Sequence, residues 1–165
     1  DYFMHIQGTT LKLKMNKIFF TTIVLLTLAI YLSQGEVAEA LCIKESKANL
    51  RKGPGKHHKK LWTVFKYMPF KQLKRQGNWL KIQDLERQKF WVHKKLTTKK
   101  YMCAVIKNSK TKLREGPGTN FPEVEWSPID KFYSAKVLKI KNAWVHIEDS
   151  DGDRAWVHRP LVWVQ

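Results

Sequence analysis

Few residues in this chain have the types and spacing that metal binding requires. His57 and His58 are adjacent among lysines, but no third histidine and no spaced cysteine or aspartate accompanies them. Residues 149–153 (Asp-Ser-Asp-Gly-Asp) resemble a calcium loop, but the glycine falls too early and no glutamate closes the site. We therefore expect a polar loop at the histidines, a hairpin turn at the aspartates, and no metal or other cofactor.

A hydrolase needs a nucleophile, a base and an orienting group in one cleft. The chain offers only a cysteine with a histidine, from the set Cys42, Cys103, His93 and His158. It has no Gly-x-Ser-x-Gly, zinc or phosphate-loop motif. The two histidines end two equivalent Trp-Val-His phrases, which favours a structural hydrogen bond at a strand end. We expect a protein without catalytic residues.

The elements that position these residues occur twice. Residues 49–55 (NLRKGPG) are repeated as residues 112–118 (KLREGPG). The phrases WLKI and WVH at residues 79–82 and 91–93 return as WVHI and WVH at residues 144–147 and 156–158. The offset is 63 residues at the glycines and 65 at the tryptophans, so the copies differ by a small insertion. The chain is therefore predicted to build one small module twice.

Short runs of strand-forming residues between turns predict a small barrel for each copy. In the first copy we expect strands at residues 48–51, 61–67, 70–75, 79–85 and 89–93, and a turn at 94–96. In the second we expect them at Leu113 and at residues 124–126, 135–140, 143–148 and 154–158, with a hairpin turn at Asp151-Gly152. No long helical period follows Cys42.

Alternation along the strands assigns core and outer positions. The predicted core residues are Leu80, Ile82, Val92, Val145, Ile147 and Val157. Four tryptophans have the opposite parity, namely Trp79, Trp91, Trp144 and Trp156. Two interpretations stay open for them: contact with a ligand in a groove, or packing beneath a loop or between the modules.

The motif Leu-Arg-x-Gly-Pro-Gly, followed by Trp-x-x-Ile and Trp-Val-His-x-x-Leu, resembles bacterial Src-homology-3-like (SH3b) domains. The tandem ending in residues 161–164 (LVWV) is similar to small exported bacterial proteins built of two such domains. The resemblance implies an all-β fold of two partly open barrels and binding of cell-wall peptide. We expect the ligand contacts at the four tryptophans and at the loops after Arg51 and Arg114, with a structural role as the alternative for these arginines. Lys89-Phe90 depart from the family pattern, which usually has glycine before the tryptophan.

A secretory leader is predicted before the modules. Residues 15–40 combine a basic start, an apolar run and a final Ala-x-Ala, which are the parts of a signal peptide. Residues 1–14 are interpreted as an upstream extension, residues 41–100 as the first module and 101–165 as the second. Without cleavage the leader would be an anchor and the only membrane contact. The prediction is export to the periplasm or cell envelope of a bacterium.

Export would permit a disulfide between Cys42 and Cys103. The bond requires Cα atoms within about 7 Å. We prefer two separate buried thiols, one in the first strand of each module.

Positive charge is concentrated in the first module. Residues 41–100 carry 18 lysines and arginines against 3 acidic residues, a net charge of +15, whereas residues 101–165 carry 10 against 8, or +2. Lys56, Lys59, Lys60, Lys94 and Lys95 are expected to attract an anionic envelope polymer; a solvated face is the alternative. Nucleic acid would be a partner only if the protein stayed inside the cell.

These observations predict a non-catalytic, exported binding module for cell-envelope material, most of all peptidoglycan or its peptides. One alternative is a targeting or scaffold subunit for a separate wall hydrolase. Another is a scaffold whose tryptophans are all buried between the modules.

Overall fold

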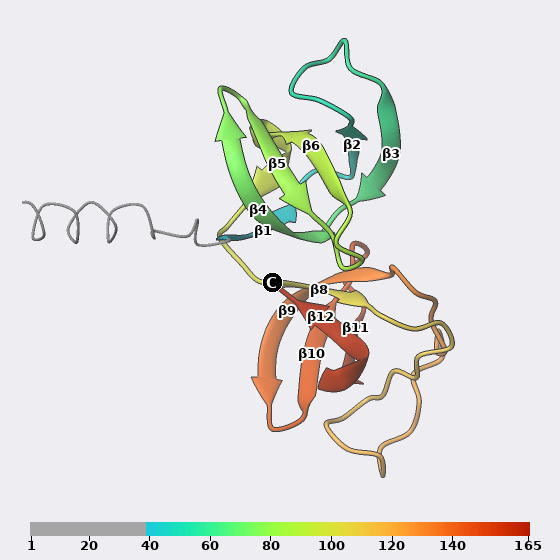
Figure 1. Ribbon diagram of the computed structural model, residues 1–165. Coiled ribbons are helices and arrows are strands. Elements are labelled where there is room, and N and C mark those ends of the chain that lie inside the picture. Colours follow the sequence, from blue (N-terminus) through green and yellow to red (C-terminus); the bar gives the residue numbers. More distant parts are fainter. Residues whose placement is uncertain (1–38) are drawn as a thin grey trace, which may run out of the picture. The chain divides into compact units, whose positions relative to one another are not determined.

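The computed structural model describes residues 39–165 (Figure 1). The predicted upstream extension and almost all of the predicted signal peptide lie outside the described residues. Only the last two leader residues, Glu39 and Ala40, are described, and they begin the first strand. Among residues 39–165 no helix has the length and apolar character that a membrane crossing requires.

The first sheet is built from the N-terminal half of the described chain. Its elements are β1 (Glu39–Ile43), β2 (Lys47–Arg51), β3 (Lys60–Phe65), β4 (Pro69–Gln76), β5 (Trp79–Gln83), β6 (Lys89–His93), the 3₁₀ helix η1 (Lys94–Leu96) and β7 (Thr97–Thr98). The strand order is β3-β2-β6-β5-β4-β1-β7. β3 is therefore an edge strand.

The second sheet uses the C-terminal half. Its elements are β8 (Cys103–Ile106), β9 (Ser134–Lys141), β10 (Trp144–Glu148), β11 (Arg154–His158), the 3₁₀ helix η2 (Arg159–Leu161) and β12 (Val162–Val164), in the order β11-β10-β9-β8-β12. The prediction of two small β units is confirmed. The sheets do not close into barrels, and the predicted leader helix falls outside the described residues.

The repeat extends to hydrogen-bond register. Lys81 pairs with Trp91 in the first sheet, and His146 pairs with Trp156 at the same place in the second. Both sheets carry a β-bulge at the equivalent point of β4 and β9. The predicted core residues are all buried: Leu80, Ile82, Val92, Val145, Ile147 and Val157. Alternation along these strands is therefore a correct guide to the core.

The predicted strand at residues 124–126 is wrong, because the chain turns there. Ser127 N–H donates to Val124 O at 3.0 Å, which closes a turn, and only single bridges form at Glu123 and Ile129. Prolines at 122 and 128 flank this segment, and proline cannot donate to a ladder. The predicted strand at Leu113 is likewise reduced to isolated bridges at Arg114.

The two sheets belong to one compact unit and are joined covalently. Cys42 in β1 and Cys103 in β8 form a disulfide with Cα atoms 6.0 Å apart, and both residues are fully buried beside Tyr67. The preferred interpretation of two separate thiols is therefore wrong. It failed because the chain alone did not indicate that Cys42 and Cys103 come within bonding distance. Ser134 Oγ also donates to Lys66 O at 2.9 Å across the sheets.

Candidate functional site

Two of the predicted ligand-binding tryptophans lie on the outer face of their sheets but are covered by neighbours. Trp91 is 8% exposed and Trp156 is 7% exposed. Lys74 Nζ lies 5.6 Å from the Trp91 ring centroid, and Lys139 Nζ lies 5.4 Å from that of Trp156. The His146 ring also stacks on Trp156, with centroids 4.6 Å apart. These two rings offer little surface to a ligand.

The other two predicted tryptophans are half-buried at the ends of β5 and β10. Trp79 meets the His93 ring edge-on at a centroid distance of 5.3 Å, and Trp144 meets His158 at the same distance. His93 Nδ1 accepts a hydrogen bond from Lys95 N–H, which caps η1. Each Trp–His pair thus lies at a strand end, and each sheet carries two of the four tryptophans.

The repeated arginines tie the Gly-Pro-Gly loops to the sheets. Arg51 Nη1 donates to His58 O at 2.8 Å, and Arg114 Nη1 donates to Phe121 O at 2.6 Å. In each loop the ring seven residues after the arginine covers the first glycine: a Cβ on Gly53 would lie 2.6 Å from His58, and one on Gly116 would overlap Phe121. These contacts fit the structural alternative, and ligand binding by the two arginines stays a prediction.

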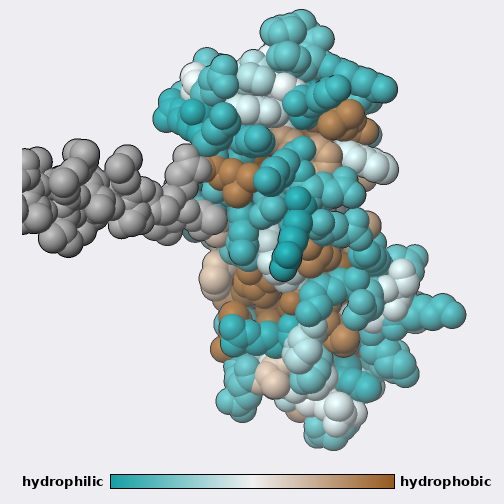
Figure 2. Space-filling model, viewed as in Figure 1, coloured by the Kyte–Doolittle hydropathy of each residue, from teal (hydrophilic) through white to brown (hydrophobic). Residues whose placement is uncertain are grey.

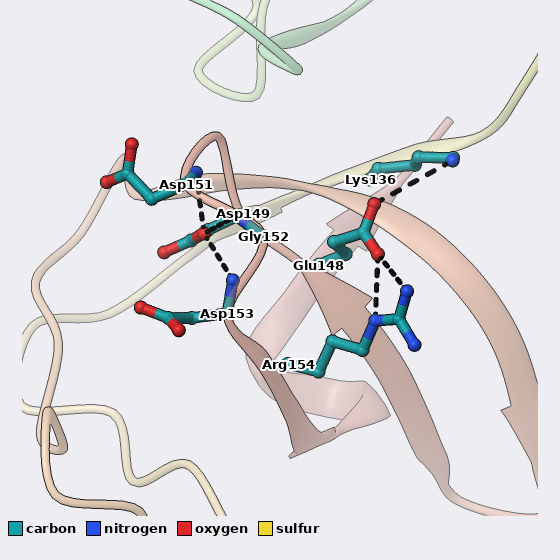
Figure 3. A network of polar contacts seen from close by, with 7 residues as sticks. All are labelled: Lys136, Glu148, Asp149, Asp151, Gly152, Asp153 and Arg154. Carbon is teal, nitrogen blue, oxygen red and sulfur yellow. Dashed lines mark hydrogen bonds and ion pairs between the residues drawn. The ribbon is translucent and has the colours of Figure 1, made fainter.

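The aspartates at residues 149–153 form a hairpin turn, as expected. Asp149 Oδ1 accepts from the backbone N–H groups of Asp151, Gly152 and Asp153 at 2.9, 2.9 and 3.0 Å (Figure 3). Asp149 Oδ2 accepts from Tyr133 O–H at 2.6 Å, and burial together with this carboxylate raises the pKa of Tyr133 well above its ordinary value. Within residues 39–165 no three His, Cys, Asp or Glu side chains gather as metal ligands do.

A pocket of about 470 Å³ opens beneath β3, and we call it the β3 groove. Its floor is the first core, at Leu50, Met68, Phe70 and Phe90, and its walls are Trp62, Val64 and Phe65 of β3 and Phe132 and Tyr133 before β9. Trp62 is 60% exposed and Phe65 is 59% exposed. A groove of this size, with aromatic walls and an apolar floor, is typical of small-ligand sites, which span about 300–1,000 Å³.

Carboxylates line the rim of the β3 groove. Asp84 and Glu86 come from the turn between β5 and β6, and Asp130 comes from the second half of the chain. Glu86 Oε1 is paired with Lys131 Nζ at 2.5 Å, and partial burial raises the pKa of Asp84. Asp130 makes no ion pair within the described residues. The groove therefore carries a net negative charge on a chain whose formal charge is +17.

Sequence reasoning did not find the β3 groove, although one signal pointed to it. Leu61, Trp62, Val64 and Phe65 place apolar side chains at both parities of one short strand. In an edge strand this pattern indicates contacts on both faces. Trp62 pairs with Leu50 in the ladder, so it points to the core side, yet no neighbour covers it. That Phe132 and Tyr133 line the same groove could not be predicted from the sequence, because it depends on how the chain folds.

The lysines predicted to attract anions lie away from this groove. Lys56, Lys59 and Lys60 are exposed around the loop between β2 and β3, Lys94 is half-buried, and Lys95 is exposed on η1. None of them lines the β3 groove. Figure 2 shows hydrophilic residues over most of the visible surface of the first sheet, with separate hydrophobic patches between them.

Comparison with known proteins identifies the repeated module. The model of the bacterial SH3 domain matches two segments, residues 44–99 and 129–164. No curated protein matches the chain.

Solved structures with some likeness belong to longer proteins. They are NlpC1 and NlpC2 from Trichomonas vaginalis, at 8% and 7% identity with TM-scores of 0.35, and an NlpC/P60 family protein from Bacillus cereus at 12% identity with a TM-score of 0.36. The alignments cover 79%, 78% and 77% of this chain. They cover 47%, 48% and 56% of those proteins, so the chain spans about half their length.

Proposed function

This chain belongs to the bacterial SH3 domain family, and we propose that it is a non-catalytic, exported binding module that holds a short cell-wall peptide in the β3 groove. The observation that carries the proposal is the combination of exposed aromatic walls and an acidic rim at one apolar pocket. Small aliphatic side chains of a peptide suit the floor, and a free amine suits Asp84 and Asp130.

The position of β3 supports a peptide as the ligand. β3 ends the strand order of its sheet, so its outer edge presents backbone N–H and C=O groups that a peptide can pair with. The exposed large side chains of β3, Leu61, Trp62 and Phe65, would flank such a peptide. Backbone pairing would hold the peptide and the groove would select its side chains.

Retention on purified peptidoglycan tests the proposal, followed by titration with soluble wall peptides. We expect the full chain to bind, and the double variant Trp62→Ala/Phe132→Ala to bind at least tenfold more weakly, because central aromatic contacts dominate binding energy. Ile140→Ala is the matched control, since Ile140 is an exposed apolar residue that does not line the groove. Equal binding by the double variant, or no binding by the unaltered chain, would refute the proposal.

The proposed contact between the free amine of the peptide and the acidic rim of the groove is tested separately. Acetylating the free amine of the peptide should weaken binding about threefold to fivefold, because exposed ion pairs contribute up to about 1 kcal/mol. The variant Asp130→Asn should lose most of that discrimination between free and acetylated peptide. Unchanged discrimination in the variant would show that Asp130 is not the partner of the amine.

A further inference from the structure

A cluster of cations occupies the outer face of the first sheet, and we call it the basic face. Cross-strand pairing places Lys71, Gln83 and Lys89 in one row across β4, β5 and β6. A second row runs from Lys74 through Lys81 and Trp91 to Arg51. Directly paired residues point to the same side of a sheet, and the alternate positions Leu80, Ile82 and Val92 are core. Both rows therefore face outward.

The second sheet has the same two rows but neutralises them in part. Glu148 stands between Lys136 and Arg154 (Figure 3). Its Oε2 is 2.7 Å from Arg154 Nη2, and its Oε1 is 3.9 Å from Lys136 Nζ. His146 replaces the central lysine of the second row, and burial lowers its pKa, with Lys139 and Arg154 adding to the effect. The carboxylate and a neutral imidazole thus leave this face with a smaller net positive charge than its counterpart on the first sheet.

The basic face has neither a carboxylate between its cations nor a histidine in place of the central lysine. Gln83 stands where the second sheet has Glu148, and its Nε2 donates to Arg87 O at 3.2 Å and not to an anion. Lys81 stands where the second sheet has His146. Among residues 39–165, none of Lys71, Lys74, Lys81 and Lys89 forms an ion pair. Lys74 is paired directly with Lys81, and like charges in that position destabilise a sheet. Lys74 contacts the Trp91 ring, but no ion pair within residues 39–165 offsets the repulsion among these lysines.

We propose that the basic face binds a linear phosphodiester polymer that carries no bases. The second row crosses four strands, about 14 Å at about 4.8 Å per strand spacing, so its charges suit an extended chain of anions. Lysine ammonium groups act as point charges that need no planar, bidentate partner, which suits phosphates along a flexible polymer. Binding would then release counterions and depend strongly on salt.

Other polyanions fit the face less well. Single-stranded nucleic acid is held by stacking of bases on aromatic rings, but Trp91 at the centre is 8% exposed and lies beneath Lys74. A membrane surface is held by apolar side chains that insert beside the charges. The exposed large hydrophobic residues of the first sheet, Leu61, Trp62 and Phe65, all lie on β3 and not in either row.

The repeat supplies the test. In the full chain, Gln83→Glu installs the carboxylate that the second sheet already has. We expect its affinity for poly(glycerol phosphate), measured by calorimetry at several salt concentrations, to fall about tenfold, with a salt slope smaller by about one charge. Thermal stability should rise, because the new carboxylate separates Lys71 and Lys89. Weaker binding by a more stable protein cannot come from misfolding.

Asn108→Asp is the matched control, since Asn108 is exposed, lies outside both rows and changes the net charge equally. It should bind like the unaltered chain. Glu148→Gln should gain affinity, because it leaves Lys136 and Arg154 unpaired. Unchanged binding by Gln83→Glu would overturn the proposal, as would an equal loss in Asn108→Asp or tighter binding to an oligonucleotide of equal charge or to anionic vesicles. Peptide binding in the β3 groove should be unaffected by Gln83→Glu, so the two proposals fail separately.

Discussion

At the scale of single residues, equivalent positions in the two halves carry different chemistry on the same framework. Arg51 and Arg114 make the same bond to the residue seven positions later, and a structural role was the alternative interpretation of the motif that both copies share. Gln83 and Glu148 occupy one ladder position but only Glu148 forms ion pairs. The repeat could be found in the sequence alone. That Gln83 and Glu148 occupy equivalent positions between two cations became clear only from the pairing of the strands.

His146 should make stability depend on pH. Its folded-state pKa lies below the ordinary value because burial and two cations disfavour the charged ring. At a pH between the two His146 pKa values, the unfolded chain binds more protons than the folded chain. The contribution of His146 to the unfolding free energy is therefore complete above the unfolded-state pKa, near 6.5, and it is lost as the pH falls toward the folded-state pKa. NMR titration should place the His146 pKa below 6.5. His146→Phe should remove that part of the pH dependence of denaturant midpoints; a ring that titrates above 6.5 would contradict the expectation.

At the scale of elements, local patterns predicted β5, β6 and the following turn closely, because alternation and turn residues act within one segment. They failed at residues 124–126, where Pro122 and Pro128 outweigh apolar side chains. They also could not predict the β3 groove. Trp62 and Phe132 are 70 positions apart in the chain, and the groove exists only because β3 ends its sheet.

The turn at Asp149 should be a large local contributor to stability. Asp149→Ala removes the acceptor for three backbone N–H groups and for Tyr133 O–H. We expect a loss of about 2–3 kcal/mol in unfolding free energy, measured by denaturant titration. Asp149→Asn keeps an acceptor and should lose less. Asp151→Ala, at an exposed position in the same turn, should change stability by less than about 0.5 kcal/mol; similar losses in Asp151→Ala and Asp149→Ala would argue against this role.

At the scale of the whole molecule, the disulfide joins the first strand of each sheet. Cys42 and Cys103 are 61 residues apart, and a closed loop of that length restricts the unfolded chain by roughly 4 kcal/mol. The double variant Cys42→Ala/Cys103→Ala should therefore unfold at clearly lower denaturant concentration than the oxidised protein. Reductant should lower the midpoint of the unaltered chain and leave that of the variant unchanged. Equal midpoints for oxidised and reduced protein would contradict a stabilising bond.

The bond between Cys42 and Cys103 has one more effect, on the outcome of proteolysis at exposed loops. Every peptide bond of the first half beyond β1, including those of the basic loop at residues 52–59, lies inside the ring that this bond closes. A protease that cuts there leaves both fragments on a single covalent molecule. A nicked protein would migrate as one species on a gel without reductant and as two with it, and its halves would reach any shared surface together.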